Sequence, residues 1–479
     1  MEKILMILEV SRKQNYIFEP RKLRDNMHRS ANIAHVTSSR FFQEVCPEGY
    51  DADRNMVYSG GGHTVVQFDT KAEADYFARA VTTRVLQNYH GMELFVQQHP
   101  YDDHMTPGEN LNELSRKLEK KKSRRDHAFR ISAVGIEGPG DTSRSVTEPN
   151  DYTPPPGWKP IQLLDGQDDD DHFLAVVHID GNAMGTRVQA IYDQCRNDWN
   201  ACVRLLNQFS SEIDQHYAQA FDEMATDLAH ALEPVYEKKH LPKLLPLRKI
   251  ISAGDDVCFM TTGRLGLECA ANFLKHLSGK KNNADGKYYT ACAGVVFIHR
   301  KFPYREAYDM SEALCRSAKE FCAKYVRSGQ DHPISALDFH VEYGQMKDTL
   351  SEIRADYRTD DGAQLELRPY AVTTNGRVPK ERTYSSLLQK LDLLRRMQSI
   401  RNFADGGLAR SKIKSLRNAL HEGEVETRLA LLMTNAGALL KEDGVKEAFF
   451  TDGDQIRRCY YFDAIELLDV TEFGQEVYL

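Results

Sequence analysis

Apolar positions follow alternately a strand-like and a helix-like period in the opening third of the chain. Ile4–Val10 predicts a strand, Arg21–Thr37 a helix, and Met56–Phe68 a hairpin around a glycine-rich tip. The apolar residues of Lys71–Asn88 recur at helical spacing, and Phe129–Val134 predicts a further strand. This β-α-β-β-α-β order is typical of a ferredoxin-like sheet.

The same order returns after a break in the pattern. Residues 138–171 are rich in glycine, proline and acidic side chains, which predicts a linker or surface loop. Two copies of one layout in a single chain indicate an internal duplication. The elements predicted for the second copy are Phe173–Ile179 (strand), Asp198–Glu233 (helix), Lys249–Ser252 and Val257–Thr261 (hairpin), Leu265–Leu277 (helix), Tyr288–Phe297 (strand) and Tyr304–Tyr325 (helix).

The last part of the chain has helical spacing, in Tyr384–Ser399, Leu408–Leu420 and Glu424–Leu440. We therefore predict an α+β chain of two ferredoxin-like domains followed by a small helical domain. The predicted boundaries are 1–137 for the first domain, 138–171 for the linker, 172–345 for the second domain, 346–380 for a connecting segment and 381–479 for the helical domain.

The composition is that of a globular intracellular protein. Of the residues 41% are hydrophobic and 28% are charged, the net charge is -8, and no apolar run approaches the ~20 residues of a membrane helix. The N-terminal apolar run is followed by Ser11 without a small-residue cleavage site, which predicts a strand and not a signal peptide. We predict a cytoplasmic protein that does not enter a membrane.

None of the nine cysteines has the CxxC spacing of a zinc ribbon or a redox pair. Buried thiols in a reducing compartment are therefore expected. Cys195 and Cys202 are seven residues apart, as are Cys315 and Cys322, which predicts that each pair shares one helix face.

Three aspartates are the strongest candidates for chemistry. Asp180 ends a long apolar run and precedes Gly181, and Asp255 and Asp256 form the tip of the second hairpin. Either motif alone is typical of an ordinary turn, but the two together, each beside an apolar strand, favour a site. Carboxylates at neighbouring strand ends hold hard divalent cations, which stabilise phosphoryl transfer and lower the pKa of an attacking hydroxyl.

Other residues are compatible with phosphate binding, and each has a plain structural alternative. Lys319 has the charge to reach a triphosphate, and Ser59–His63 places free N–H groups at a hairpin tip. A solvated helix position and a flexible turn explain these residues equally well. The basic run Arg116–Arg125 favours a solvated helix face over an RNA contact, and so does the C-terminal basic set of Arg395, Arg396, Arg401, Arg410, Lys412, Lys414 and Arg417.

Nearly the whole chain resembles the large palm-polymerase subunit of type III CRISPR effector complexes. The motifs that carry this resemblance are Ser11-x-x-Gln14-x-Tyr16-Ile17-Phe18, Lys22-Leu23-Arg24, Arg29-Ser30-Ala31, Tyr58-Ser59-Gly60-Gly61-Gly62, His178 to Gly185, Pro246 to Ile250, Ala253-Gly254-Asp255-Asp256, Ala291–Gly294, His299 to Pro303, Ala318-Lys319, Ser335 to His340 and Arg368-Pro369-Tyr370. Together they are specific, whereas a Gly-Asp-Asp motif alone is not.

The resemblance implies a nucleotidyltransferase that uses ATP to make a nucleotide second messenger, such as a cyclic oligoadenylate. It implies that Asp180, Asp255 and Asp256 hold two Mg²⁺ or Mn²⁺ ions and act in catalysis. ATP and its phosphates would be bound by Gly60, Gly61, Gly62, Asn182, Gly254 and Lys319. It further implies activation by crRNA and target RNA, together with other type III effector subunits.

The chain also departs from the family pattern. It has no His-Asp dipeptide, so the HD nuclease domain of many members is expected to be absent, and it has no CxxC zinc element. Ala253 replaces the first glycine of the family's hairpin motif. Two alternatives to the enzyme stay open. One is a catalytically weak RNA-binding scaffold that depends on the basic C-terminal helices, and the other is a cyclase that acts outside any complex.

Overall fold

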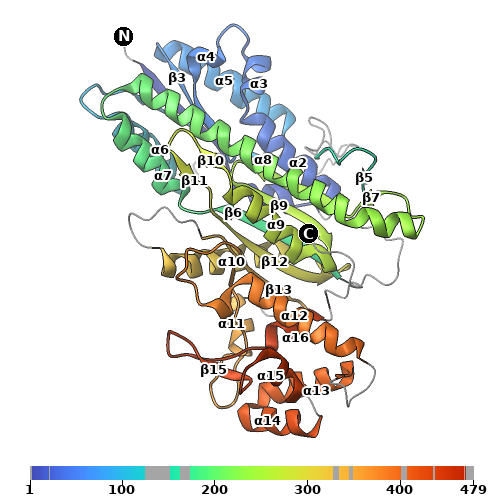
Figure 1. Cartoon of the computed structure of the whole chain (residues 1–479). Coiled ribbons are helices and arrows are strands. Elements are labelled where there is room, and N and C mark those ends of the chain that lie inside the picture. Colours follow the sequence, from blue (N-terminus) through green and yellow to red (C-terminus); the bar gives the residue numbers. More distant parts are fainter. Residues whose placement is uncertain are drawn as a thin grey trace.

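Two sheets that share one four-strand arrangement form the frame of the molecule (Figure 1). The computed structural model describes residues 3–20, 22–124, 152–161, 173–326, 334–344, 349–400, 407–434, 437–468 and 470. The first sheet has the order β2-β3-β1-β4, and all of its pairs are antiparallel. Its strands are β1 (Ile4–Ser11), β2 (Met56–Gly60), β3 (His63–Phe68) and β4 (Glu93–Pro100).

The helices of this first half vary in length from 4 to 18 residues. They are α1 (Lys13–Phe18), α2 (Leu23–Val36), α3 (Ser39–Val45), α4 (Ala52–Asn55), α5 (Lys71–Asn88) and α6 (Pro107–Arg124). A capping box begins α5, where Thr70 and Glu73 each accept a hydrogen bond from the other's backbone N–H. The basic run predicted at 116–125 ends α6, whose Leu111, Leu114 and Leu118 are buried. Because Lys121 donates to the Val96 carbonyl, this run is partly packed on the first sheet.

The fourth strand of the first sheet is β4, which the sequence analysis missed. The strand predicted at Phe129–Val134 lies outside the described residues. β4 gives a weak signal because Leu94 and Phe95 are buried, while Gln97 and Gln98 are only half-buried on an edge strand. The hydrogen-bond pairing with β1 stabilises the strand despite this polar sequence.

The second sheet contains the same four-strand arrangement and extends it. Its order is β14-β13-β12-β6-β9-β8, so β8-β9-β6-β12 matches β2-β3-β1-β4, which confirms the predicted internal duplication. The added strand β13 is parallel to β12, and β14 pairs antiparallel with β13. The strands are β6 (Phe173–Gly181), β8 (Leu247–Ala253), β9 (Asp256–Thr262), β12 (Ala291–His299), β13 (Ala336–Val341) and β14 (Tyr370–Ala371).

Five α-helices follow the strands of the second half. They are α7 (Met184–Cys195), α8 (Trp199–Lys238), α9 (Gly266–Ser278), α10 (Tyr304–Tyr325) and α11 (Leu350–Ala355), and a short 3-10 turn η2 (Gly263–Leu265) precedes α9. Two small ladders, β5 (Lys159–Pro160) with β7 (Leu244–Leu245) and β10 (Lys281–Asn282) with β11 (Lys287–Tyr288), complete this part.

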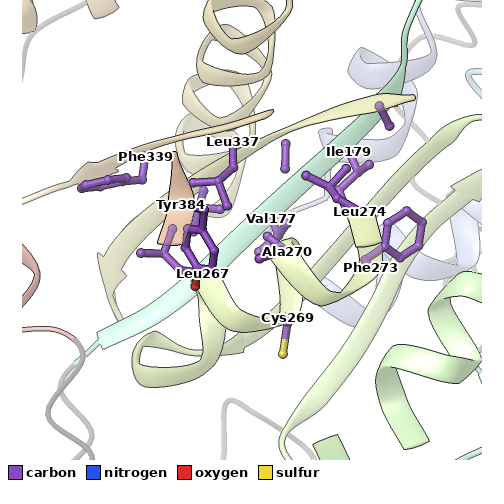
Figure 2. Close-up of a cluster of buried hydrophobic side chains, with 14 of the residues drawn as sticks. Val177, Ile179, Leu267, Cys269, Ala270, Phe273, Leu274, Leu337, Phe339 and Tyr384 are labelled. Carbon is purple, nitrogen blue, oxygen red and sulfur yellow. The ribbon is translucent and has the colours of Figure 1, made fainter. Parts of the chain in front are cut away.

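The two halves share their hydrophobic cores. Along β1 and β6 alternate side chains belong to opposite sheet faces, as strand geometry requires. Met6 and Val176 therefore belong to one cluster of buried residues, and Ile7 and Val177 belong to the other. Figure 2 shows part of the latter cluster, where Val177 and Ile179 lie beside Ala270, Phe273 and Leu274 of α9. Each half also contributes a helix that packs on the sheet of the other half. α8 of the second half contacts β2 of the first sheet, and α2 of the first half contacts β8 of the second sheet.

The C-terminal part is mainly helical, as predicted. It comprises η3 (Lys380–Arg382), α12 (Tyr384–Ser399), α13 (Arg410–Glu422), α14 (Glu424–Met433), α15 (Gly437–Asp443) and α16 (Phe462–Leu468), with the hairpin of β15 (Phe449–Thr451) and β16 (Arg457–Cys459). The single helix predicted at Glu424–Leu440 is divided into α14 and α15. β14 lies within the predicted connecting segment, so this segment contributes a strand to the second sheet.

All nine cysteines are buried free thiols, as expected. Cys315 and Cys322 both belong to α10, as their spacing predicts. Cys195 and Cys202 do not share a helix, because α7 ends at Cys195 and a turn precedes α8. Within the described ranges, no helix is both long and apolar enough to cross a membrane.

The close packing of α10 on β12 gives a first prediction. A Cβ atom on Gly294 would overlap the Ser311 carbonyl oxygen and lie 2.6 Å from the Cys315 backbone nitrogen. Because helix backbone cannot move aside as a side chain can, Gly294→Ala is expected to destabilise the fold by about 3 kcal/mol or more. Urea unfolding would measure this loss. Gly437→Ala is the control, since nothing lies within 4 Å of its added methyl group, and equal stability of the two variants would contradict the packing.

Candidate functional site

The tips of the two hairpins, one from each sheet, lie against each other. Each tip is a two-residue turn, Gly61-Gly62 between β2 and β3 and Gly254-Asp255 between β8 and β9. Gly61, Gly62 and Gly254 have φ values of 58°, 76° and 68°, a left-handed region that glycine adopts without strain. A Cβ on Gly254 would lie 3.2 Å from the Gly61 nitrogen, so glycine also permits the close approach of the two tips.

The position of Ala253 is explained by the same geometry. Ala253 is the last residue of β8, it pairs with Asp256, and its φ is not positive. The first glycine of the motif in the family that the chain resembles is therefore replaced at a strand position, where any residue can adopt the backbone conformation. The turn itself depends on Gly254, which this chain retains.

A cavity of about 410 Å³ opens between the two tips and the helices α7 and α8. Its walls include aromatic and aliphatic side chains from both halves of the molecule, and one carboxylate. The lining residues are Tyr58, Gly60, Gly61, His63, Asn112, Met184, Gly185, Val188, Gln189, Tyr192, Leu206, Phe209, Ser210, Ile213, Gly254 and Asp255. This volume is within the range of small-molecule sites.

The start of α7 borders this cavity and has free N–H groups. Ala183 precedes the helix with a φ of 58°, and no side chain caps the helix N-terminus. Met184 and Gly185, the first two residues of α7, both line the cavity. Uncapped N–H groups and the helix dipole favour an anion at this position. The sequence analysis did not predict α7.

The three predicted aspartates lie together at the ends of β6 and β9. Asp180 and Asp256 are directly opposite each other in the antiparallel register, and Asp255 is the preceding turn residue. A Cβ on Gly181 would lie 2.8 Å from Asp255 Oδ2, so the carboxylate of Asp255 packs against this glycine. Lys319 Nζ donates to Asp180 Oδ2 at 2.6 Å and to the Gly181 carbonyl at 2.7 Å.

Burial, together with neighbouring negative charge, raises the pKa values of Asp255 and Asp256. Burial, and then the negative charge of Asp180, raise the pKa of Asp255 to about 7. Burial also raises the pKa of Asp256, against the opposing charge of His178, whose Nδ1 lies 3.5 Å from Asp256 Oδ1. That Oδ1 is buried and has no hydrogen-bond partner. Both observations indicate that this strand end has a deficit of positive charge.

Lys13 supplies positive charge from the other half of the molecule, and the sequence analysis missed it. Its ammonium donates to the Gly61 carbonyl, and a Cβ on Gly62 would lie 2.9 Å from Lys13 Cε. Burial lowers the pKa of Lys13, while the carboxylates of Glu9, Asp256 and Asp255 act to raise it. The only available signal was its place inside the Ser11-x-x-Gln14 motif.

The first sheet has an altered counterpart of the acidic site. Glu9 is opposite His63 in the register, as Asp180 is opposite Asp256, and Gly62 replaces Asp255. Lys122 bonds Glu9 at 2.8 Å, in the way that Lys319 bonds Asp180. Burial, and then the charge of Lys13, lower the pKa of His63 to about 4. One carboxylate therefore remains at this end, where the second sheet has three.

The three aspartates are not gathered as a ready ligand set. Within the part of the chain that the structure describes, no group of three or more His, Cys, Asp or Glu side chains is placed to hold a metal ion. Asp180 binds the Lys319 ammonium and Asp256 faces His178. The Asp256 oxygen without a hydrogen-bond partner, and the burial and repulsion that raise the pKa of Asp255, nevertheless fit a divalent cation, because a cation would stabilise both carboxylates.

The other predicted binding residues are divided between two places. Gly60, Gly61 and Gly254 line the cavity, and Gly62 packs behind it against Lys13. Asn182 does not line the cavity, and its side-chain amide donates a hydrogen bond to the Ile334 carbonyl at 3.4 Å. Lys319 contacts Asp180 directly.

Comparisons with known proteins concern the fold of the chain and its second sheet. The family model described as Cas10/Cmr2, second palm domain, matches residues 173–324, the segment from β6 through most of α10. Among solved structures, the chain is similar to an apo Csm1–Csm4 cassette with a TM-score of 0.56 and 12% identity, covering 98% of this chain and 70% of that chain. The predicted resemblance is confirmed over residues 173–324, and the predicted α+β palm fold is confirmed by the structural similarity over nearly the whole chain.

Two further structures share the fold over the same extent. They are the Csm1–Csm4 cassette in complex with one ATP (TM-score 0.52, 13% identity) and in complex with cA3 (TM-score 0.51, 12% identity), each covering 98% of this chain and 70% of that chain. No curated protein matches the chain.

The raised pKa of Asp255 gives a second prediction. Its folded-state pKa of about 7 exceeds the ordinary 3.8, so ionisation of this carboxyl costs stability as the pH rises from about 4 through 7. In the presence of a chelator, Asp255→Asn is expected to raise the Tm at pH 8 by about 2 °C and to have no such effect below pH ~4. Thermal unfolding across pH measures this, with the exposed Asp103→Asn as control. A gain in Tm that does not depend on pH would contradict the raised pKa of Asp255.

Proposed function

We propose that this chain is a nucleotidyltransferase of a type III CRISPR system that uses ATP to make an adenylylated second messenger such as a cyclic oligoadenylate. The observation that carries the proposal is the 410 Å³ cavity, which both hairpin tips line and which has Asp255 in its wall. A cavity shared by two palms accommodates a nucleotide beside the acidic strand ends of the second sheet.

The cavity walls suit a nucleotide. Tyr58, Tyr192 and Phe209 offer aromatic surface for a base, and Gly60 and Gly61 bring backbone without side chains to the cavity wall. The free N–H groups that begin α7 are a second place for a phosphate. Gly60, Gly61 and Gly62 would cradle one nucleotide, and the acidic end of the second sheet would face the other.

Asp180, Asp255 and Asp256 would hold Mg²⁺ or Mn²⁺, two ions as the family resemblance implies. Such ions, when bound, neutralise the phosphate charge and make a hydroxyl group a better nucleophile. The protein contributes the placement of three carboxylates on two hydrogen-bonded strands. Binding would also release Asp180 from its hydrogen bond with Lys319.

Lys319 and Lys13 have complementary roles in this proposal. Once Asp180 has a cation, the Lys319 ammonium is free to neutralise the triphosphate. Lys13 approaches the same carboxylates from the first half and bonds the Gly61 carbonyl, so it positions the two hairpin tips together. A 3′-oxygen of one nucleotide would bond to the α-phosphorus of the other while the bond to the β-phosphate oxygen breaks. Pyrophosphate would leave, and the hydroxyl proton would pass to solvent.

The similar Csm1 structures support this proposal by the ligands that they are described as holding, one ATP and cA3. Their assembly with Csm4 supports other type III subunits as partners of this chain. We further propose that crRNA and target RNA activate the complex, and that it acts in the cytoplasm, in accord with the buried free thiols.

The scaffold alternative depends on basic residues of α13. Lys412 donates to the Thr434 carbonyl, and Arg410 and Lys414 also have partners within the chain. Arg401, from the same predicted set, lies outside the described residues. These intramolecular contacts favour the enzyme over a scaffold that relies on this charge for RNA binding.

A third prediction tests catalysis. Asp255→Ala with Asp256→Ala is expected to lower product formation from ATP and Mn²⁺ by about 10³-fold or more, because two of the three carboxylates are lost. Mass spectrometry of the products measures this, for the purified chain and for the assembled complex with target RNA. The matched control is Asp102→Ala with Asp103→Ala, an exposed Asp-Asp pair before α6.

The outcomes separate the alternatives. Product from the isolated chain identifies a cyclase that needs no complex, and product from the complex alone identifies an RNA-activated subunit. Absence of product from both, or equal product from the double variant, would overturn the proposal.

A fourth prediction concerns Lys13. Lys13→Met removes a cation from between the hairpin tips and is expected to lower kcat/KM for ATP by roughly 10-fold or more while the protein stays folded. Lys71→Met, which alters an exposed lysine of an i,i+4 pair on α5, is the control. If Lys13→Met retained full activity, the positioning role would be wrong.

A further inference from the structure

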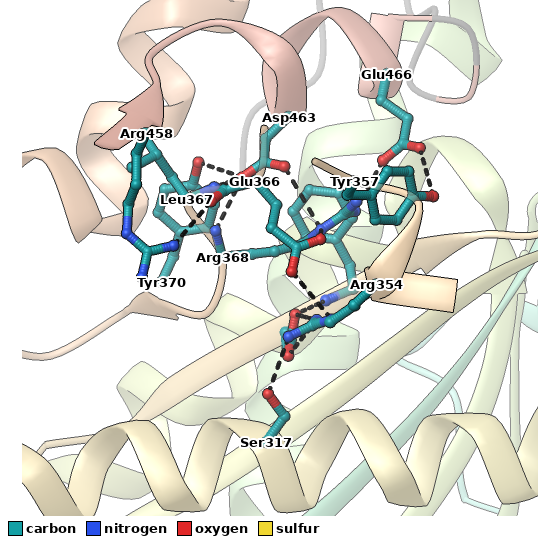
Figure 3. Close-up of polar contacts among 12 residues, drawn as sticks. Ser317, Arg354, Tyr357, Glu366, Leu367, Arg368, Tyr370, Arg458, Asp463 and Glu466 are labelled. Carbon is teal, nitrogen blue, oxygen red and sulfur yellow. Dashed lines mark hydrogen bonds and ion pairs between the residues drawn. The ribbon is translucent and has the colours of Figure 1, made fainter. Parts of the chain in front are cut away.

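A second cavity of about 530 Å³ lies between α10 and the C-terminal part of the chain. Arginines dominate its lining, as the view of the polar network around it illustrates (Figure 3). Six basic side chains and two glutamates contribute to the wall. The lining residues are Ser317, Glu320, Phe321, Lys324, Ser351, Arg354, Ala355, Tyr357, Arg358, Gln364, Glu366, Arg368, Pro369, Arg382 and Arg458.

This basic cavity is separate from the nucleotide cavity. Ser317, Glu320, Phe321 and Lys324 line it at helical spacing, so one face of α10 forms its wall. Lys319, on the same helix, lies on a different face and bonds Asp180. The two cavities have no lining residue in common.

Three of the arginines have carboxylate partners within the chain. Arg354 makes two hydrogen bonds of 2.7 Å to Asp338, and Arg458 Nε bonds Asp452 at 2.5 Å. Arg368 Nη1 lies 2.8 Å from Glu466 Oε2, and Asp463, which also accepts the Tyr370 hydroxyl, is nearby at 3.5 Å. These pairs hold the arginines in place around the cavity, as the dashed lines in Figure 3 indicate for Arg354 and Arg368.

Arg382 differs from these three. It is only 4% exposed, its Nε is buried without a hydrogen-bond partner, and it has no ion pair among the described residues. Its guanidinium lies over the Phe321 ring at 4.4 Å, which leaves the N–H groups at the guanidinium edge. Burial, and then the charge of Arg458, lower its pKa, and Asp338, the carboxylate that opposes this effect, already binds Arg354.

We propose that this cavity is a binding site for the phosphate group of a small phosphorylated ligand, with Arg382 as the buried cation that the ligand neutralises. A buried arginine without a counter-ion is costly unless an anion completes it. Its planar fork of N–H donors matches phosphate oxygens, and Lys324 and the exposed Arg358 add charge at the wall. The volume accommodates more than a single phosphate ion, which favours a pyrophosphate or a nucleotide.

Calorimetric titration with pyrophosphate and with ATP, in EDTA and at low salt, tests the proposal on the full chain. We expect pyrophosphate to bind, with a Kd raised at least 10-fold by Arg382→Gln and raised less by Arg358→Gln. Because Arg358 is exposed, the second variant should fold normally even if Arg382→Gln does not. Pyrophosphate binding that persists in Lys319→Gln but is weakened in Arg382→Gln would assign it to the basic cavity and not to the nucleotide cavity.

The comparison of the two probes identifies the ligand class. A higher affinity for ATP than for pyrophosphate, lost in Arg382→Gln, would point to a nucleotide, and the reverse order would point to a free polyphosphate. Arg396→Gln, which alters an exposed i,i+4 pair on α12, is the control and should have no effect. No binding of either probe, or binding that both cavity variants leave intact, would overturn the proposal whatever the outcome for catalysis.

Discussion

Mutual repulsion of three carboxylates at one strand end is the constraint on which the functional part of the molecule depends. Asp180 and Asp256 face each other across two paired strands, and Asp255 is the adjacent turn residue. Hydrogen-bonded strands cannot separate to relieve the repulsion, so the surroundings must supply positive charge. Lys319 supplies it from α10 and Lys13 from the first half of the chain. The interface between the two halves is thus tied to the electrostatics of the acidic site.

Glycines in the hairpins and behind α10 make this arrangement sterically feasible. Gly254 and Gly61 permit backbone-to-backbone approach, and Gly294 permits α10 to lie on β12 at the distance that brings Lys319 to Asp180. The crossing of α8 to β2 and of α2 to β8 then buries both sheets in shared cores. A site formed by short-range contacts between two halves therefore depends on packing that extends through the whole pair of sheets.

The sequence predicted the elements whose pattern is local and strong. α10 and α12 have the predicted bounds, and β6 ends at the Asp-Gly step because an apolar run stops there. β4 was missed because an edge strand tolerates polar residues. α7 was missed although Met184, Val188, Ile191 and Cys195 recur at helical spacing in its sequence. The position of Lys13 beside Asp255 and Asp256 depends on the contact of the two halves, which no local pattern contains. The lack of an ion pair at Arg382 among the described residues could not be predicted for the same reason, because the residues around it come from distant segments of the chain.

The two hairpin tips also differ in the charge of their side chains. The register places Glu9, Gly62 and His63 where the second sheet has Asp180, Asp255 and Asp256. The two copies of the fold therefore differ at the side chains that carry charge. A symmetric pair of palms would present two identical half-sites and no preferred direction. One chain therefore has two unlike ends, an acidic end with three carboxylates and an end where the single carboxylate of Glu9 is paired with Lys122. The two faces that such a pair of ends presents to the space between them are thus unlike, and a single copy of the protein contains both ends.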